Sequence, residues 1–93
     1  MREKLIERNL VQAVCRMGGL APKFNSPGWA GAPDRLVLLP GGRLAFVEVK
    51  APGKALRLLQ VKRKGQLEAL GFRVYVIDRL EQIGGVLDEI CSP

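Results

Sequence analysis

The side chains best suited to chemistry are Asp34 and the pair Glu48 and Lys50. Glu48 and Lys50 are separated by one residue in an apolar run, so on a β-strand both side chains project from the same face. A glycine-rich turn at residues 40–42 would fold this run back onto the run that follows Asp34. Asp34 and Glu48 lie at comparable distances from that turn, and we therefore expect their carboxylates to meet.

Two carboxylates placed in this way can hold a divalent cation through oxygen ligands. The carbonyl of Val49 lies between Glu48 and Lys50 and could complete the ligand set. Lys50 would stand beside the cation, where an ammonium group can orient or deprotonate a water molecule and neutralise charge on a phosphate oxygen. The competing interpretation is a solvated ion pair, worth well under about 1 kcal/mol. The apolar flanks disfavour it, because a charged pair in a buried strand costs free energy unless a ligand compensates its charge.

The composition excludes several kinds of catalysis. The chain has 93 residues and no histidine, so a Ser-His-Asp triad, a Cys-His pair or a histidine-ligated zinc site cannot be built from it alone. The two cysteines, Cys15 and Cys91, lack the Cys-x-x-Cys spacing of a redox motif. Cys15 lies among apolar residues at helical spacing and is expected to be a reduced thiol in the core. Acid–base and metal chemistry therefore fall to carboxylates and lysines.

The charge balance points to a polyanionic partner. Fifteen Lys and Arg residues against nine Asp and Glu residues give a net charge of +6, and nucleic acid is the default partner for such a chain. No apolar run approaches the roughly 18 residues of a membrane span, and the N-terminus lacks the apolar region of a signal peptide. We expect a cytoplasmic protein that does not enter a membrane.

Hydrophobic periodicity indicates which elements position the candidate site. The expected order is a helix at 3–17, a short strand at 20–25, a loop at 26–33, strands at 35–39 and 44–49, a helix at 58–70, a strand at 72–77 and a helix at 80–90. The first three strands should form an antiparallel meander. The fourth follows through a helix, so it should pair in parallel with the third by a right-handed crossover. The sequence thus predicts one α/β domain over residues 1–93, with a mixed central sheet and a C-terminal helix.

The chain resembles the VRR-NUC nucleases of the PD-(D/E)xK superfamily over essentially its whole length. The resemblance rests on Gly28…Gly31-Ala32-Pro33-Asp34-Arg35-Leu36-Val37, on Phe46-Val47-Glu48-Val49-Lys50-Ala51-Pro52-Gly53 and on Gln60. It implies a nuclease core in the order helix, three strands, helix, strand, which is the order inferred above. Stand-alone members of this size resemble small phage- or prophage-encoded proteins.

The resemblance implies catalytic roles for Asp34, Glu48, Lys50 and Gln60. Asp34 and Glu48 would bind Mg²⁺, or Mn²⁺ as a substitute, and Lys50 would be the catalytic lysine. Gln60 matches a glutamine at the start of the crossover helix that would help to orient the water or the phosphate.

A carboxylate of the first helix would add to the metal site. Glu3 matches the spacing of the family better and ranks first, and Glu7 is the second choice. The alternative for either residue is an ordinary carboxylate that interacts favourably with the dipole of the helix N-terminus.

Basic residues beside the site would contact DNA. Lys23 matches a lysine that is common in the family before the loop. The other predicted contacts are Lys54, Arg57, Lys62, Arg63 and Lys64. Such residues would position DNA through its phosphates without reading sequence, and the alternative is a solvated helix face. Trp29 could wedge into a DNA junction or pack on the domain, and packing is favoured.

The function implied by the resemblance is metal-dependent endonucleolytic hydrolysis of DNA. The expected enzyme is a homodimeric Holliday-junction resolvase in the cytoplasm of a bacterial or phage-infected cell. Alternatives are a nicking or flap nuclease of phage DNA metabolism and a catalytically inactive, basic DNA-binding accessory protein. The last helix offers an apolar face that could form the dimer contact or pack on its own sheet: Ile83, Val86, Leu87 and Ile90.

Overall fold

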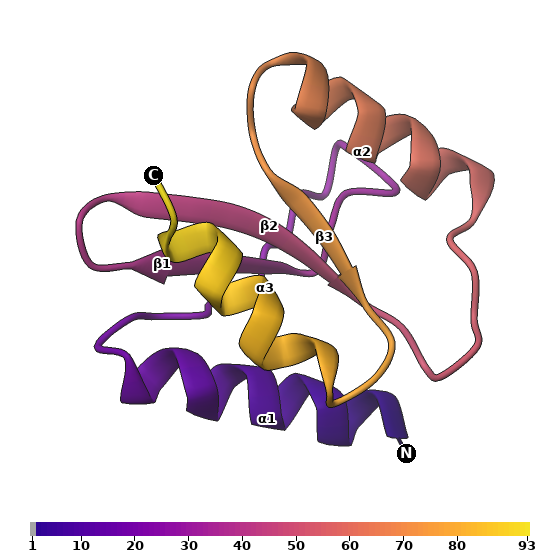
Figure 1. Cartoon of the computed structure of the whole chain (residues 1–93). Coiled ribbons are helices and arrows are strands. Elements are labelled where there is room, and N and C mark those ends of the chain that lie inside the picture. The colour runs from indigo at the N-terminus through magenta and orange to yellow at the C-terminus, as the bar shows by residue number, and fades with distance from the viewer. Residues whose placement is uncertain (1) are drawn as a thin grey trace.

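A mixed three-stranded sheet lies at the centre of the molecule, with helices on both of its faces (Figure 1). The structure is a computed structural model that describes residues 2–93. Its elements in chain order are α1 (Arg2–Arg16), β1 (Arg35–Leu39), β2 (Arg43–Val49), α2 (Leu58–Ala69), β3 (Val74–Ile77) and α3 (Gln82–Cys91). The predicted α/β class and the order of the helices are confirmed.

The strand order is β1-β2-β3, so β2 is the central strand. β1 and β2 are antiparallel, with Arg35 opposite Val47, and β2 and β3 are parallel, with Glu48 opposite Val76. These are the hairpin and the helical crossover expected from the sequence. They put the carboxyl end of β2, where Glu48 and Lys50 lie, next to the start of β1.

The strand predicted at residues 20–25 is reduced to two isolated bridges. Leu20 pairs with Leu38 and Lys23 with Arg35, both in the antiparallel sense. Pro22 lies between the bridges and has no N–H group to donate, so a continuous ladder cannot form there. The segment follows β1 along the expected antiparallel path, but the prediction of a regular strand at 20–25 is wrong.

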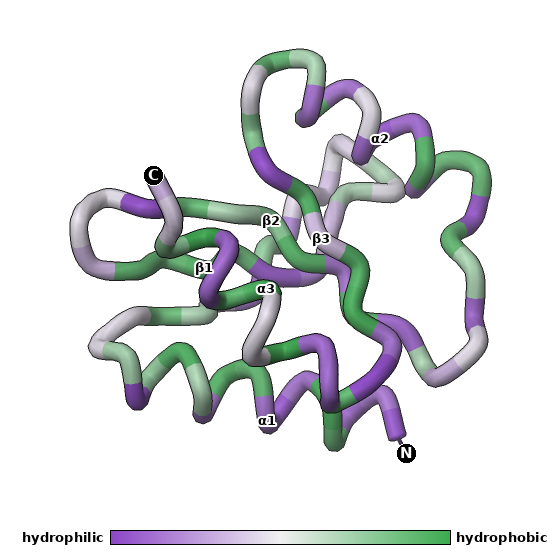
Figure 2. The backbone as a smooth tube through the Cα atoms, in the orientation of Figure 1, coloured by the Kyte–Doolittle hydropathy of each residue, from purple (hydrophilic) through white to green (hydrophobic). Residues whose placement is uncertain are grey.

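One face of the sheet carries the main core, which α1 and α3 cover. The strands are apolar along most of their length, whereas α1 and α2 alternate between apolar and hydrophilic segments (Figure 2). Because a helix with this alternation buries one side only, α1 contributes Ile6, Leu10 and Val14 to the core. Cys15 lies on the exposed side of α1, so the prediction of a core thiol is wrong, although both cysteines are free.

The apolar face of α3 is used within the chain. Ile83, Leu87 and Ile90 are buried in the main core, and Val86 is half-buried against it. Of the two uses considered for this face, packing on its own sheet is therefore confirmed, and the suggested dimer contact at α3 is wrong.

The opposite face of the sheet carries a smaller apolar cluster beneath α2. Phe46, Leu67 and Val74 are buried there, and Trp29 is half-buried against them, as the packing interpretation of Trp29 predicted. Of the residues of α2, only Gln60 and Leu67 are buried. Leu58 is left 90 % exposed and Val61 52 % exposed. Within residues 2–93, no helix has the length and apolar character needed to cross a membrane.

Candidate active site

Asp34 and Glu48 meet at the edge where β1 begins and β2 ends. A carboxylate oxygen of Asp34, Oδ2, accepts a hydrogen bond from the backbone N–H of Val49 at 3.2 Å. This bond places the Asp34 carboxylate at Val49, the residue after Glu48. The negative charge of Asp34 therefore acts directly on the Glu48 carboxylate. The hairpin therefore brings the two carboxylates together, as the spacing from the turn predicted.

Glu48 is buried, with 5 % of its surface exposed. Its Oε2 accepts a hydrogen bond from Nε2 of Gln60 at 3.1 Å and lies 3.8 Å from Nζ of Lys50. Its Oε1 is buried and has no hydrogen-bond partner among the described residues. Burial, followed by the negative charge of Asp34, raises the pKa of Glu48 to about 7, while the charge of Lys50 opposes this shift.

These properties suit a divalent cation. The site holds two carboxylates, one of them buried with an unpartnered oxygen, so negative charge is in excess there. A hard cation would supply both the missing positive charge and a ligand for the free oxygen. Within residues 2–93, no three His, Cys, Asp or Glu residues form a cage that could hold a metal by themselves. Mg²⁺ does not require such a cage, because it usually keeps several waters and uses one or two carboxylates together with substrate phosphates. Asp34 and Glu48, with the backbone of Val49 between them, fit that donor set.

The two carboxylates of α1 open onto the same cavity as Asp34. This cavity of about 350 Å³ is lined by Glu3, Glu7, Lys23, Phe24, Asn25 and Asp34. Oε2 of Glu7 accepts a hydrogen bond from Nε of Arg35 at 3.2 Å, whereas Glu3 is exposed. Both candidates therefore border the site.

Arg35 is a site residue that the sequence analysis missed. Its guanidinium donates to Glu7 and, through Nη1, to the carbonyl oxygen of Ala21 at 2.7 Å. It thereby ties α1 to the start of β1, directly beside Asp34. An arginine that immediately follows the candidate metal ligand, in a run that is otherwise apolar, was the available signal.

Gln60 has both ends of its side-chain amide engaged. Its Oε1 accepts a hydrogen bond from the backbone N–H of Arg57 at 2.9 Å, and its Nε2 donates to Glu48. The first bond satisfies a backbone donor that would otherwise be unpaired at the start of α2. Gln60 thus links the N-terminus of α2 directly to the Glu48 carboxylate.

The predicted DNA contacts fall into two groups. Lys23, Lys54, Arg57 and Lys62 are exposed, and none of their side chains makes an ion pair within residues 2–93. Lys64 is half-buried and pairs with Glu68 at 2.8 Å, and Arg63 donates to the carbonyl oxygen of Ala30 at 2.8 Å. The exposed group has side chains available for phosphates, whereas the other two residues already have partners within the chain.

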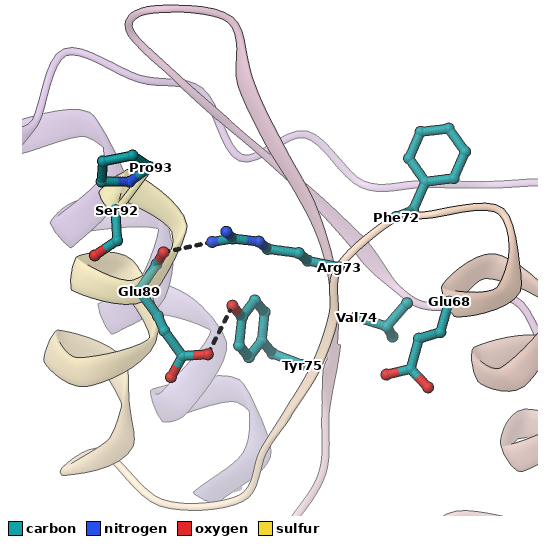
Figure 3. A pocket seen from close by; sticks show the side chains of 8 residues that line it. All are labelled: Glu68, Phe72, Arg73, Val74, Tyr75, Glu89, Ser92 and Pro93. Carbon is teal, nitrogen blue, oxygen red and sulfur yellow. Dashed lines mark hydrogen bonds between the residues drawn. The ribbon is translucent and has the colours of Figure 1, made fainter.

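Another large cavity lies elsewhere, along β3 between α3 and the end of α2 (Figure 3). It measures about 570 Å³ and is lined by Glu68, Phe72, Arg73, Val74, Tyr75, Glu89, Ser92 and Pro93. Arg73 donates to the backbone carbonyl of Glu89, and the hydroxyl of Tyr75 donates to the Glu89 carboxylate at 3.1 Å. Glu68 pairs with Lys64, and Glu89 accepts from Tyr75, so both carboxylates of this cavity already have partners within the chain. None of the candidate metal ligands lines it, and this cavity is therefore not the candidate active site.

Comparisons with known proteins show what the whole chain is similar to. No family model matches the sequence. The chain is 50 % identical over 78 residues to a protein named "Putative nuclease p44" from Acyrthosiphon pisum secondary endosymbiont phage 1, covering 84 % of each chain. Its structure is similar to a solved structure described as "VRR_NUC domain", with a TM-score of 0.89 and 28 % identity over 95 % of this chain and 96 % of that chain.

Proposed function

The chain belongs to the VRR-NUC family of nucleases, and from that membership we propose that it is a metal-dependent endonuclease that hydrolyses DNA phosphodiester bonds, with branched DNA as substrate. The observation that carries the proposal is the buried Glu48 carboxylate with the half-buried Asp34 carboxylate beside it. Oε1 of Glu48 has no hydrogen-bond partner among residues 2–93, and the ammonium group of Lys50 stands beside the two carboxylates. A structural ion pair would leave no buried oxygen without a partner.

Each side chain of the site has a distinct task in this mechanism. Asp34 and Glu48 would hold Mg²⁺ or Mn²⁺, which when bound would polarise the scissile phosphate and lower the pKa of a water molecule. Lys50 would hold the attacking water in place and neutralise charge that develops on a phosphate oxygen. Gln60 fixes the rotamer of Glu48, since its amide donates to Oε2 and leaves Oε1 free for a ligand.

Binding of DNA would use the exposed basic residues that surround this site. Lys23 borders the cavity that contains Asp34, and Lys54, Arg57 and Lys62 lie along the loop before α2 and on α2 itself. Their contacts would be to phosphates, so they would hold many DNA sequences alike. The net charge of +6 supports this kind of binding.

We further propose that the enzyme acts as a homodimer on four-way junctions, in the cytoplasm of the cell in which phage DNA is processed. Paired incisions in a two-fold symmetric substrate need two centres related by the same symmetry. Since the apolar face of α3 is used internally, we place the contact on the outer side of α2, where Leu58 and Val61 are exposed. A two-fold contact there would bring the Arg57 and Lys62 side chains of both copies next to each other, so one DNA molecule could span both sites.

The experiment compares three DNA substrates, a four-way junction, a flap and a plain duplex, each with and without Mg²⁺. We expect Mg²⁺-dependent cleavage of the junction, and loss of cleavage in Asp34→Asn and Glu48→Gln, because an amide keeps the shape but gives up the charge that a hard cation requires. Calorimetric titration should show weaker Mg²⁺ binding in both variants. Unchanged Mg²⁺ affinity would contradict this metal site.

Cleavage of only the flap or duplex would assign the alternative nuclease, and DNA binding without any cleavage would assign an inactive accessory protein.

A further inference from the structure

Arg63 was predicted to contact DNA, but its side chain is engaged within the chain. Its Nε donates to the carbonyl oxygen of Ala30 at 2.8 Å, and its Nη1 donates to Oε1 of Gln66 at 3.0 Å. The guanidinium carbon lies 5.0 Å from the centroid of the Trp29 ring, which is within the range of a cation–π contact. The guanidinium therefore contacts both the loop backbone, at Ala30, and a loop side chain, that of Trp29.

A second contact fixes the same loop to α2. Gly31 has a φ of +86°, and a Cβ placed on it would lie 2.7 Å from Cγ of Leu59 and 3.0 Å from the carbonyl oxygen of Leu59. Because a side chain would fit neither this backbone conformation nor this space, glycine allows the loop backbone to lie directly against the first turn of α2. The loop at residues 26–33 is thus held at Gly31 by Leu59 and at Ala30 by Arg63.

This loop ends at the metal site. Pro33 is buried, and Asp34 follows it directly. α2 also contacts the other carboxylate, because Gln60 donates to Oε2 of Glu48. One helix therefore reaches both proposed metal ligands: Glu48 through Gln60, and Asp34 through the loop.

We infer that Arg63 is a positioning residue of the metal site, whose hold on Ala30 and Trp29 sets where Asp34 stands relative to Glu48. The role in metal binding rests on the proposed function. An arginine suits this role, because its planar guanidinium can donate in its plane while its face covers an aromatic ring, and a lysine ammonium cannot do both. Lys62, the preceding residue, is exposed and serves as the contrasting phosphate contact.

The test compares Arg63→Ala, Arg63→Lys and Lys62→Ala with the unchanged protein in three measurements. Trp29 is the only tryptophan, so quenching of its fluorescence by acrylamide in metal-free protein reports on the loop alone. Calorimetry gives the affinity for Mg²⁺, and fluorescence anisotropy without Mg²⁺ gives the affinity for DNA as a function of salt. Thermal unfolding by circular dichroism establishes that each variant is folded, and Arg63→Lys, which keeps the charge and the aliphatic stem, provides the folded comparison if Arg63→Ala does not fold.

Both Arg63 variants should expose Trp29 to quencher and weaken Mg²⁺ binding by about tenfold, the scale at which loss of supporting contacts affects a metal site. Their DNA affinity should stay within about twofold, since no phosphate contact is lost. Excess Mg²⁺ should restore their cleavage, which it would not do for a merely misfolded protein. Lys62→Ala should instead weaken DNA binding and reduce the slope of log affinity against log salt concentration by about one. Its Trp29 quenching and its Mg²⁺ affinity should be unchanged.

Two results would overturn the inference. One is an Arg63 variant that binds Mg²⁺ as tightly as the unchanged protein and shows the same Trp29 quenching. The other is an Arg63 variant that behaves like Lys62→Ala, which would make Arg63 a phosphate contact. If the unchanged protein binds no Mg²⁺, the proposed function fails, and unaltered quenching in the Arg63 variants would separately show that the loop is not held by Arg63.

Discussion

Glu48 is a charged residue on the central strand of a small domain, in a position that apolar side chains normally occupy. Removing a carboxylate from water costs free energy unless partners replace the lost hydration. Here Gln60 and Lys50 serve Oε2 alone, while Oε1 has no partner among the described residues. The chain therefore retains a destabilising group at this position, as is common where a protein binds a ligand.

Lys50→Ala should reduce cleavage by at least about 100-fold, the scale on which a single group that stabilises transition-state charge contributes to kcat. DNA affinity should change little, because Lys50 is one of fifteen basic residues and is largely buried. The measurements are junction cleavage with Mg²⁺ and anisotropy without it. Cleavage near the unchanged rate in the variant would remove Lys50 from the mechanism.

The stability of the metal-free protein should depend on pH through Glu48. The pKa of Glu48 rises from 4.5 to about 7 on folding, so the folded state binds a proton that the unfolded state has released. The contribution of Glu48 is therefore greatest below about pH 4.5 and is lost as pH rises through 7, with a slope of up to about 1.4 kcal/mol per pH unit. No histidine titrates in this window.

Urea unfolding with a chelator present, between pH 5 and pH 8, measures this effect. Glu48→Gln is the matched control, since it cannot titrate and its stability should stay level across the same range. A parallel decline in both proteins would assign the pH dependence to other groups.

At the level of residues, the sequence predicted which carboxylates meet but not what surrounds them. Asp34 and Glu48 could be paired from the hairpin alone, because the distance of each from a turn fixes its place in an antiparallel ladder. The engagement of Arg63 with Ala30 and Trp29 could not be predicted, since it joins a helix to an irregular loop. Loops have no periodicity from which such contacts can be inferred.

At the level of elements, the predicted and observed bounds agree most closely where a clear hydrophobic pattern ends near a glycine. β1 was predicted at 35–39 and is observed at Arg35–Leu39, and α2 was predicted at 58–70 and is observed at Leu58–Ala69 in spite of Gly65. β3 begins at Val74 rather than at residue 72, because the backbone N–H of Phe72 still bonds back to the carbonyl of Leu67 in α2. The largest error, at residues 20–25, came from a proline within an otherwise plausible strand.

Two glycines should respond in opposite ways to replacement by alanine. Gly85 lies in α3, and a Cβ there would meet no atom within 4 Å. Gly85→Ala should therefore raise the free energy of unfolding by roughly 0.5–1 kcal/mol through helix propensity alone. Gly31→Ala should lower it by about 1 kcal/mol or more, because of its positive φ and its contact with Leu59.

Thermal unfolding measures both effects, since about 1 kcal/mol shifts the Tm of a domain of this size by roughly 4–8 °C. A Gly31→Ala variant as stable as the unchanged protein would show that the loop can leave α2 without cost.

At the level of the whole molecule, the sequence predicted one basic α/β nuclease domain but not its outer contacts. Amphipathic periodicity shows that a helix has an apolar side, but it does not show whether that side meets its own sheet or a second chain. α3 illustrates this limit, since Ile83, Leu87 and Ile90 of its apolar face are buried in the core and Val86 packs against it. α2 is the reverse case, because its apolar residue Leu58 is not covered by the core and faces solvent.

The oligomeric state follows as a prediction about α2. Light scattering at micromolar concentration should show a dimer, and Val61→Glu should convert it to a monomer, because a charge placed in an apolar contact is desolvated without a partner. The matched control is Val86→Glu on α3, which should destabilise the fold rather than change the mass of the folded species. A monomer that still makes symmetric cuts in a four-way junction would contradict the dimer proposal.

Because β2 is the central strand, the structure around Glu48 should open less often than the structure around Asp34. Backbone amides of a strand bonded on both sides exchange with solvent only when the sheet as a whole opens, whereas loops and their anchors open locally and far more often. Glu48 lies on that strand, between β1 and β3, while Asp34 follows a loop. Local opening will therefore separate Asp34 from a Glu48 that is still in place. If the proposed site binds a cation, the protein should release it before it unfolds as temperature or denaturant rises, so the temperature limit for cleavage should lie below the melting temperature.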